Sequence, residues 1–272
     1  MTAAALPVPV GLPARRGATF GRVLTSEWFK AWGLRSVRWT VACMVLLGTG
    51  MAFLSGNDPL VGADGYGSIA YFVTSTLPIT QFPLLLLGVL LGSGEFSSRS
   101  AGSTFVAVPD RTLVLVAKTA VTTAIAAVTA VTALGLSAAA TLVSGIGPAL
   151  SVTLTAETTR MWVGSALYLV AATVFCFGLG MLLRRSTAAI LVAFIIYVLD
   201  FALLAAPDGV GMVADLLPGH TGQVVTATDE QIALMQEVGS LAADPWTSLA
   251  VAATWAVAMT LVAGLRLRRH DI

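Results

Sequence analysis

The chain has 272 residues, of which 57% are hydrophobic and only 11% are charged, and its mean hydropathy is +0.88. A water-soluble domain carries about 25% charged residues, so this composition excludes an ordinary soluble globular protein and indicates a chain solvated by lipid. The formal net charge of +1 is uninformative by itself, but the positions of the charges along the chain are not.

Six apolar runs approach the length of about 20 residues that a helix needs to cross a hydrocarbon core of roughly 30 Å. They cover residues 39–55, 69–92, 114–143, 161–183, 187–206 and 246–265. The third run is over-long, and we expect its span to begin near Thr119, after Lys118, and so to cover 119–143. The sequence therefore predicts an all-α, polytopic membrane protein with about six transmembrane helices.

The basic residues lie almost entirely on one side of these spans. Every Lys and Arg except Arg160 falls before the first span, in the second or fourth connection, or after the last span. The odd-numbered connections instead hold most of the acidic residues. The positive-inside rule places such basic segments in the cytoplasm, so both the N and the C terminus are predicted to be cytoplasmic.

The segments outside the spans differ in character. Residues 1–21, rich in Ala, Pro and Gly, are predicted to form a disordered cytoplasmic tail ahead of a transmembrane domain over 22–269. Residues 22–38 combine tryptophans with cations and predict an amphipathic helix in the cytoplasmic interface, although a simple aromatic anchor before the first span is an alternative. The one sizeable external loop, 207–245, contains a helical pattern over 229–241.

The second span carries polar and small residues along one predicted helical face. At about 3.6 residues per turn, this face contains Thr74, Pro78, Gln81, Leu85, Gly88 and Gly92. Prolines free backbone carbonyls, and polar side chains within lipid seek protein or water, which favours a pathway-lining role. The spacing of the two glycines equally suits close helix packing, so both interpretations stay open.

Asp200 is the one carboxylate predicted inside a span, toward the outer part of the fifth. A functional interpretation makes it a proton or substrate contact. We favour the simpler interpretation, in which it lies near the outer interface and reaches water or bonds a hydroxyl. Cys43 and Cys176 also fall inside predicted spans and are interpreted as small packing residues rather than a disulfide or metal pair.

Motifs of well-defined chemistry are missing from the sequence. It contains no H-E-x-x-H, no metal-ligand cluster, no G-x-S-x-G and no G-x-x-x-x-G-K-[ST]. No catalytic, cofactor-binding or metal-binding residue is therefore predicted in this chain. Transport powered by ATP would need an ATPase on another polypeptide.

Several short motifs follow one another in a defined order. The connection 93–118, in which we expect short helices at the cytoplasmic face, contains Gly94-Glu95-Phe96, Gly102-Ser103-Thr104, Pro109, Arg111 and Lys118. This series resembles ABC transporter permeases of the type-2 exporter kind, as do SEWFKAW (26–32), LLRRSTAAI (182–190) and LPGHTGQVV (217–225). The resemblance covers residues from about 22 to 269. Ser103 departs from the family pattern, in which Gly and Thr are more often adjacent.

The resemblance implies a permease subunit that forms a translocation pathway as a homodimer, or as a heterodimer with a related permease. A separately encoded ABC ATPase would power it and would hold the ATP and Mg. The implied coupling residues that dock on that ATPase are Glu95, Phe96, Arg99, Gly102, Thr104, Pro109, Arg111 and Lys118. The second and fifth spans would line the pathway or the dimer interface, with the residues Thr74, Pro78, Gln81, Gly88, Gly92 and Asp200.

The implied location is the plasma membrane of a bacterium, of high GC content to judge from the Ala, Val, Leu and Gly bias. Membrane lipid is an expected partner and nucleic acid is not. The aliphatic spans favour an amphipathic or hydrophobic export substrate. Two other interpretations stay open: an ion-coupled secondary transporter or channel that uses Asp200, and a membrane enzyme or non-transporting scaffold.

Overall fold

The computed structural model describes residues 19–57, 68–97, 110–145, 152–203, 216–237 and 244–269, with the backbone alone for 200–203. Every regular element in these ranges is a helix. The helices are α1 (Phe20–Gly33), α2 (Arg35–Ser55), α3 (Ile69–Thr74), α4 (Leu77–Thr80), α5 (Phe82–Ser97), α7 (Arg111–Leu142), α8 (Ala156–Leu183), α9 (Ser186–Leu203), α11 (His220–Thr226), α12 (Asp229–Glu237) and α13 (Pro245–Arg269).

Four of these helices, α2, α7, α8 and α13, are long and apolar enough to cross a membrane. The α3–α4 segment and α5 together pass the same test but are bent by 47°, which gives a fifth candidate span if the pair counts as one. The helix α9 is apolar but shorter. The prediction of an all-helical fold is therefore confirmed for the described part of the chain, which holds four or five candidate membrane spans.

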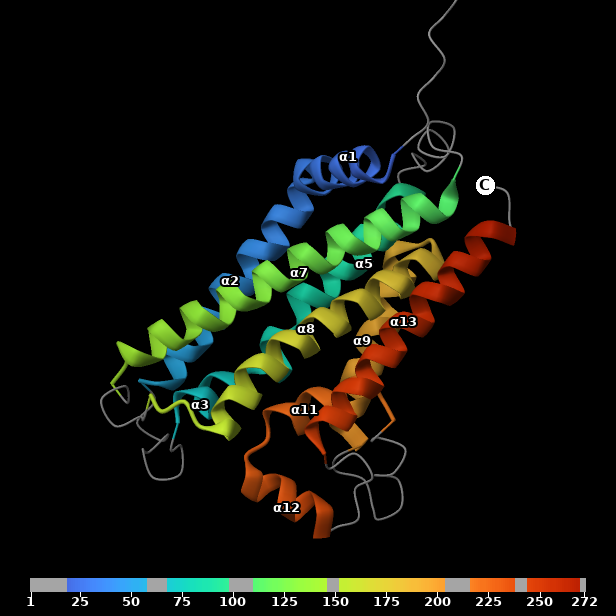
Figure 1. The fold of residues 1–272 in the computed structure, drawn as a ribbon. Helices are drawn as coiled ribbons and strands as arrows, with labels where there is room; N and C mark the ends of the chain where they lie inside the picture. The colour runs from blue at the N-terminus through green and yellow to red at the C-terminus, as the bar shows by residue number, and fades with distance from the viewer. Residues whose placement is uncertain are drawn as a thin grey trace, which may run out of the picture.

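The helix α8 is the centre of the bundle, in contact with α5, α7 and α13 (Figure 1). Glycines allow the closest of these approaches. A Cβ atom on Gly88 or Gly92 of α5 would collide with the backbone carbonyl oxygens of Thr173 and Phe177 in α8. A Cβ on Gly178 of α8 would likewise meet the backbone of α13. These contacts between backbones give a tightly packed core without large side chains.

Most of the described basic residues, Arg160 being an exception, gather at one end of the bundle. There the Arg111 guanidinium donates to the backbone carbonyl of Leu267 at 2.8 Å, Arg266 donates to that of Leu182, and Arg268 donates to the Thr112 hydroxyl at 2.9 Å. The start of α7 and the ends of α8 and α13 are thereby joined. We call this the basic end; α1 lies at the same end, and α11 and α12 lie at the opposite one (Figure 1).

Three helix boundaries differ from the sequence-based expectation. The helix expected over 22–38 is two helices, because Leu34 adopts an extended backbone (φ −76°, ψ 122°) between α1 and α2. The first begins at Phe20, so the last residues of the expected disordered tail are helical. The helix that contains the third apolar run begins at Arg111, ahead of the span start expected near Thr119, because the Asp110 carboxylate caps the first turn by accepting from the Thr112 and Leu113 amides.

The second span is not the single helix over 69–92 that the sequence predicts. The helix is interrupted after Thr74 and again at Gln81, one residue before α5 begins. Pro78 and Pro83 cannot donate backbone hydrogen bonds to the preceding turn, which is a common cause of such breaks. The helix expected over 229–241 is present as α12, which ends at Glu237; residues 238–243 lie outside the described ranges.

Candidate functional site

Four charged side chains from three helices form a closed network at the basic end. On α1, Glu27 accepts from Lys30 at 2.7 Å through one carboxylate oxygen and from Lys118 of α7 at 2.9 Å through the other. On α5, the Glu95 carboxylate lies 3.2 Å from Lys30 and 3.1 Å from Lys118. Each carboxylate thus contacts both ammonium groups, and the four formal charges cancel.

The network is largely shielded from solvent. The side chain of Glu27 is 4% exposed and that of Lys118 12%, whereas Lys30 is 42% exposed. Burial lowers the pKa of the Lys30 ammonium, but hydrogen bonding and the charges of Glu27 and Glu95 outweigh it, so that its pKa lies above the usual value. A buried ion pair adds little net stability, yet removing one partner typically costs about 3–5 kcal/mol. The network therefore holds the three helices in one arrangement.

A cavity of about 550 Å³ lies beside the network, lined in part by Gly94, Leu34 and Ser97. The start of α9 also borders it: the Ser186 hydroxyl lies 2.8 Å from that of Ser93 and donates to that of Ser97 at 3.3 Å. The end of α5 is thus bonded to α1 and α7 on one side and to α9 on the other.

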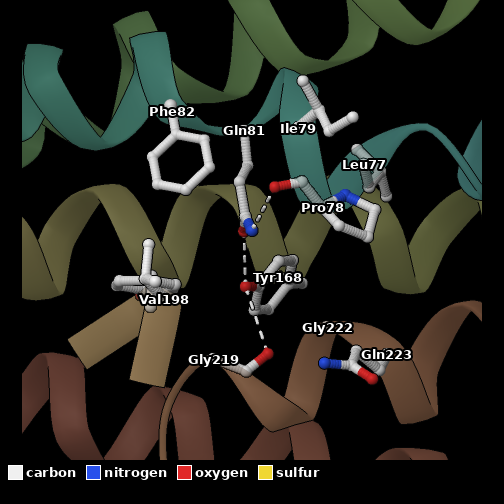
Figure 2. A pocket seen from close by; sticks show the side chains of 11 residues that line it. Leu77, Pro78, Ile79, Gln81, Phe82, Tyr168, Val198, Gly219, Gly222 and Gln223 are labelled. Carbon is white, nitrogen blue, oxygen red and sulfur yellow. Dashed lines mark hydrogen bonds between the residues drawn. The ribbon is translucent and has the colours of Figure 1, made fainter. Parts of the chain in front are cut away.

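A second polar cluster lies at the break before α5, toward the middle of the bundle. Buried Gln81 accepts a hydrogen bond from the Tyr168 hydroxyl of α8 at 2.6 Å, and its amide donates to the Pro78 carbonyl at 3.2 Å (Figure 2). The same hydroxyl lies 3.5 Å from the carbonyl oxygen of Gly219, just before α11. These bonds connect the break to α8 and to the segment preceding the last span.

A cavity of about 320 Å³ opens beside this cluster. Figure 2 shows its walls: the Leu77–Phe82 segment, Tyr168 of α8, Val198 of α9, and Gly222 and Gln223 of α11. Its lining is mostly apolar with a few convergent amide and hydroxyl groups, which is the usual character of a pocket for a small or amphipathic molecule.

The implied coupling residues divide into three groups. Glu95 and Lys118 belong to the charge network. Phe96 lies under the Arg184 guanidinium, 5.2 Å from it, and Arg111 bonds α13. Arg99, Gly102, Thr104 and Pro109 lie outside the described residues. Both ends of the segment between Glu95 and Lys118 are helical, because α5 continues to Ser97 and α7 begins at Arg111. We call the residues between these two helices, 98–110, the connection.

The polar face expected along the second span is interrupted, because the helix breaks within it. Pro78 and Gln81 line the 320 Å³ cavity, while Thr74 is fully buried and its hydroxyl bonds the Tyr71 carbonyl. Gly88 and Gly92 pack against α8 of the same chain, which is the packing interpretation of these two glycines. The side chain of Asp200 lies outside the described part of the chain.

Sequence reasoning singled out neither Glu27 nor Tyr168. A signal for Glu27 is present: it falls between Val23 and Ala31 at intervals of four residues, on the face of α1 that the structure buries. A carboxylate on the apolar face of an amphipathic helix needs a cation partner. Tyr168 has no comparable local signal, because its partner Gln81 is 87 residues away.

No protein-family model matches the chain, and no curated protein matches it. Among the described residues, no group of His, Cys, Asp and Glu side chains is arranged to hold a metal ion.

Proposed function

We propose that this chain is the membrane-spanning permease subunit of an ATP-driven exporter, powered by an ATPase on a separate chain. The observation that carries the proposal is the network of Glu27, Lys30, Glu95 and Lys118. It joins the interfacial helix α1 to the last turn of α5 and to α7, the two helices on either side of the connection 98–110. A partner that pushes on this connection would move all three helices together.

The motif resemblance supports this assignment, because the type-2 exporter motifs are centred on this connection. In the proposed mechanism the ATPase binds the connection and ATP-driven closure displaces it. The displacement reaches α5 and α7 directly along the chain, and reaches α1 through the contacts of Glu95 and Lys118 with Lys30 and Glu27. The break at Gln81 gives α5 a point about which its orientation can change relative to α3 and α4, and the cavity of about 320 Å³ lies at that point.

The proposal includes six spans in a bacterial plasma membrane, with both termini cytoplasmic. The spans are α2, the bent α3–α5 segment, α7, α8, α9 and α13. The positive-inside rule supports this orientation, because Arg111, Arg184, Arg185 and the arginines after Gly264 lie at the basic end. A cysteine in place of exposed Leu234 of α12 should react with an impermeant maleimide from outside intact cells. A cysteine in place of exposed Arg185 should react only after permeabilisation; the reverse pattern would overturn the orientation.

A dimer is the proposed working form, and a groove of about 530 Å³ between α2, α5 and α9 is the surface we assign to the second permease subunit. Exposed Trp39 and Phe194 and partly exposed Leu86 line it. This choice rests on the resemblance, which places the second and fifth spans at the subunit interface. A cysteine introduced at Phe194 should cross-link between two copies if the assignment is right.

The deciding experiment is a mild-detergent purification of the tagged chain from its native membrane, with mass spectrometry of the bound proteins. A stoichiometric P-loop ATPase is expected. Charge reversal at Arg99, inside the connection, should reduce the recovered ATPase, whereas reversal at Arg269, at the end of α13, should not. Intact, folded protein without any ATPase would contradict the proposal and make ion-coupled transport the next hypothesis to test.

A further inference from the structure

A long groove runs between the first half of α7 and the last third of α13. Its volume is about 830 Å³, and its walls extend from Arg111 to Ala127 on α7 and from Thr260 to Arg268 on α13. At about 1.5 Å per residue the α13 wall is roughly 12 Å long. One leaflet of a bilayer has a hydrocarbon thickness of about 15 Å, half of the whole core. The α13 wall is therefore close to one leaflet in length, and the α7 wall, roughly 24 Å long at the same rise, exceeds one leaflet.

The groove is chemically graded along its length. At the basic end Arg111, Thr112 and Arg268 form its mouth, and farther from that end the walls are formed by small and aliphatic residues such as Ala120, Leu261 and Gly264. Gly264 allows α13 to approach Leu115 on the opposite wall closely, since a Cβ there would meet the end of that side chain. An elongated apolar ligand with a polar head at one end fits this gradient.

The charge at the mouth favours an anion. Exposed Arg268 makes one side-chain hydrogen bond within the described residues, to the Thr112 hydroxyl at 2.9 Å, and no ion pair. The nearby Asp110 carboxylate accepts from the first amides of α7. The positive charge extends beyond the groove: burial and then the charges of Arg266 and Arg111 hold the pKa of the Arg184 guanidinium below its usual value.

We propose that this groove binds an anionic phospholipid, with the lipid phosphate on Arg268 and Arg111 and one acyl chain between α7 and α13. Guanidinium groups pair well with phosphate oxygens because their donors form a planar fork. The charge of Arg266, two residues before Arg268, disfavours the cationic headgroup of a zwitterionic lipid by like-charge repulsion, so headgroup charge decides occupancy. A lipid bound in this way would join α7 to α13 at the end where the charge network joins α7 to α1.

The test is native mass spectrometry of the purified full-length chain after exchange into dioleoyl-phosphatidylglycerol or dioleoyl-phosphatidylcholine. Wild-type protein should retain phosphatidylglycerol at activation energies that strip phosphatidylcholine. Loss of one charged hydrogen-bonding group should weaken retention about tenfold, so we expect that reduction for Arg268→Gln. Equal retention of the two lipids by the wild type would overturn the proposal.

Two further variants separate headgroup binding from structural damage. Arg269→Gln removes a charge from the same last turn but not from the groove, and should bind like the wild type. Ala124→Trp, at an exposed position in the groove wall, should block the acyl chain and abolish lipid retention. A loss in Arg269→Gln equal to that in Arg268→Gln, or unchanged binding in Ala124→Trp, would refute the site.

Discussion

The charge network makes a quantitative prediction for Glu27→Gln. The substitution keeps the volume of the side chain but, among the described residues, leaves Lys30 and Lys118 paired with the Glu95 carboxylate. Removing one partner of a buried ion pair costs about 3–5 kcal/mol. We expect about 3 kcal/mol here, the lower limit, because Glu95 still contacts both ammonium groups and Lys30 is 42% exposed.

This loss should appear as weaker docking of α1. Its remaining contacts include Val23 against Val114 and Ala117 of α7, which keep the helix associated but easier to open. A cost of about 3 kcal/mol corresponds to a roughly hundredfold larger opening constant. Hydrogen–deuterium exchange of the purified chain should therefore accelerate about a hundredfold in α1 and stay unchanged in α8.

Two controls define the outcome for Glu27→Gln. Arg22→Gln removes a charge from the exposed face of α1 and should leave the exchange of α1 unchanged. Adding Lys118→Met to Glu27→Gln restores neutrality and should recover most of the protection, because the two residues interact directly. The reasoning is refuted if α1 of the Glu27→Gln variant exchanges at the wild-type rate. It is also refuted if adding Lys118→Met accelerates the exchange of α1 further instead of restoring its protection.

The two remaining predictions concern the packing of α5 and the break that precedes it. Gly88→Ala should destabilise the protein by about 1–3 kcal/mol through overpacking against α8. Gly94→Ala is the control, because a Cβ there meets nothing within 4 Å, and it should be neutral or slightly stabilising. Equal shifts in the thermal unfolding temperature of the two variants would contradict this packing. Gln81→Leu leaves the buried Tyr168 hydroxyl without its short acceptor and should cost about 1–3 kcal/mol, measured by thermal unfolding. Combining it with Tyr168→Phe removes both polar partners and should recover much of that loss.

The helices that the sequence predicts well are those with a uniform apolar run. The cores of α7, α8 and α13 lie where hydropathy places them, because burial in lipid requires little more than length and apolar character. Their ends depend on individual polar residues. Lys118 interrupts the apolar run and suggests a later start, yet α7 begins at Arg111, where Asp110 caps it, and Lys118 is accommodated by two carboxylates on neighbouring helices.

The candidate site is harder to predict from the sequence, because its residues are far apart along the chain. Glu95 and Lys118 were predicted as coupling residues from motif resemblance, but the carboxylate that completes their network, Glu27, precedes them by 68 residues or more. Arg160, the exception to the charge asymmetry, has a similar explanation. It donates to the Ala227 carbonyl and pairs with Asp229, each at 2.9 Å, and so fastens α8 to α11 and α12.

These contacts divide the bundle into parts of unequal restraint. The helices α7, α8 and α13 are joined at the basic end by arginine bonds to Leu267, Leu182 and Thr112, and α1 is joined to α5 and α7 by the charge network. At this end α9 follows α8 directly, since α8 ends at Leu183 and α9 begins at Ser186, and the Ser186 hydroxyl bonds it to α5. A displacement of the connection 98–110 would carry α1, α5 and α7 together. Relative motion would then be taken up at the break near Gln81, which forms one wall of the cavity that α9 also borders.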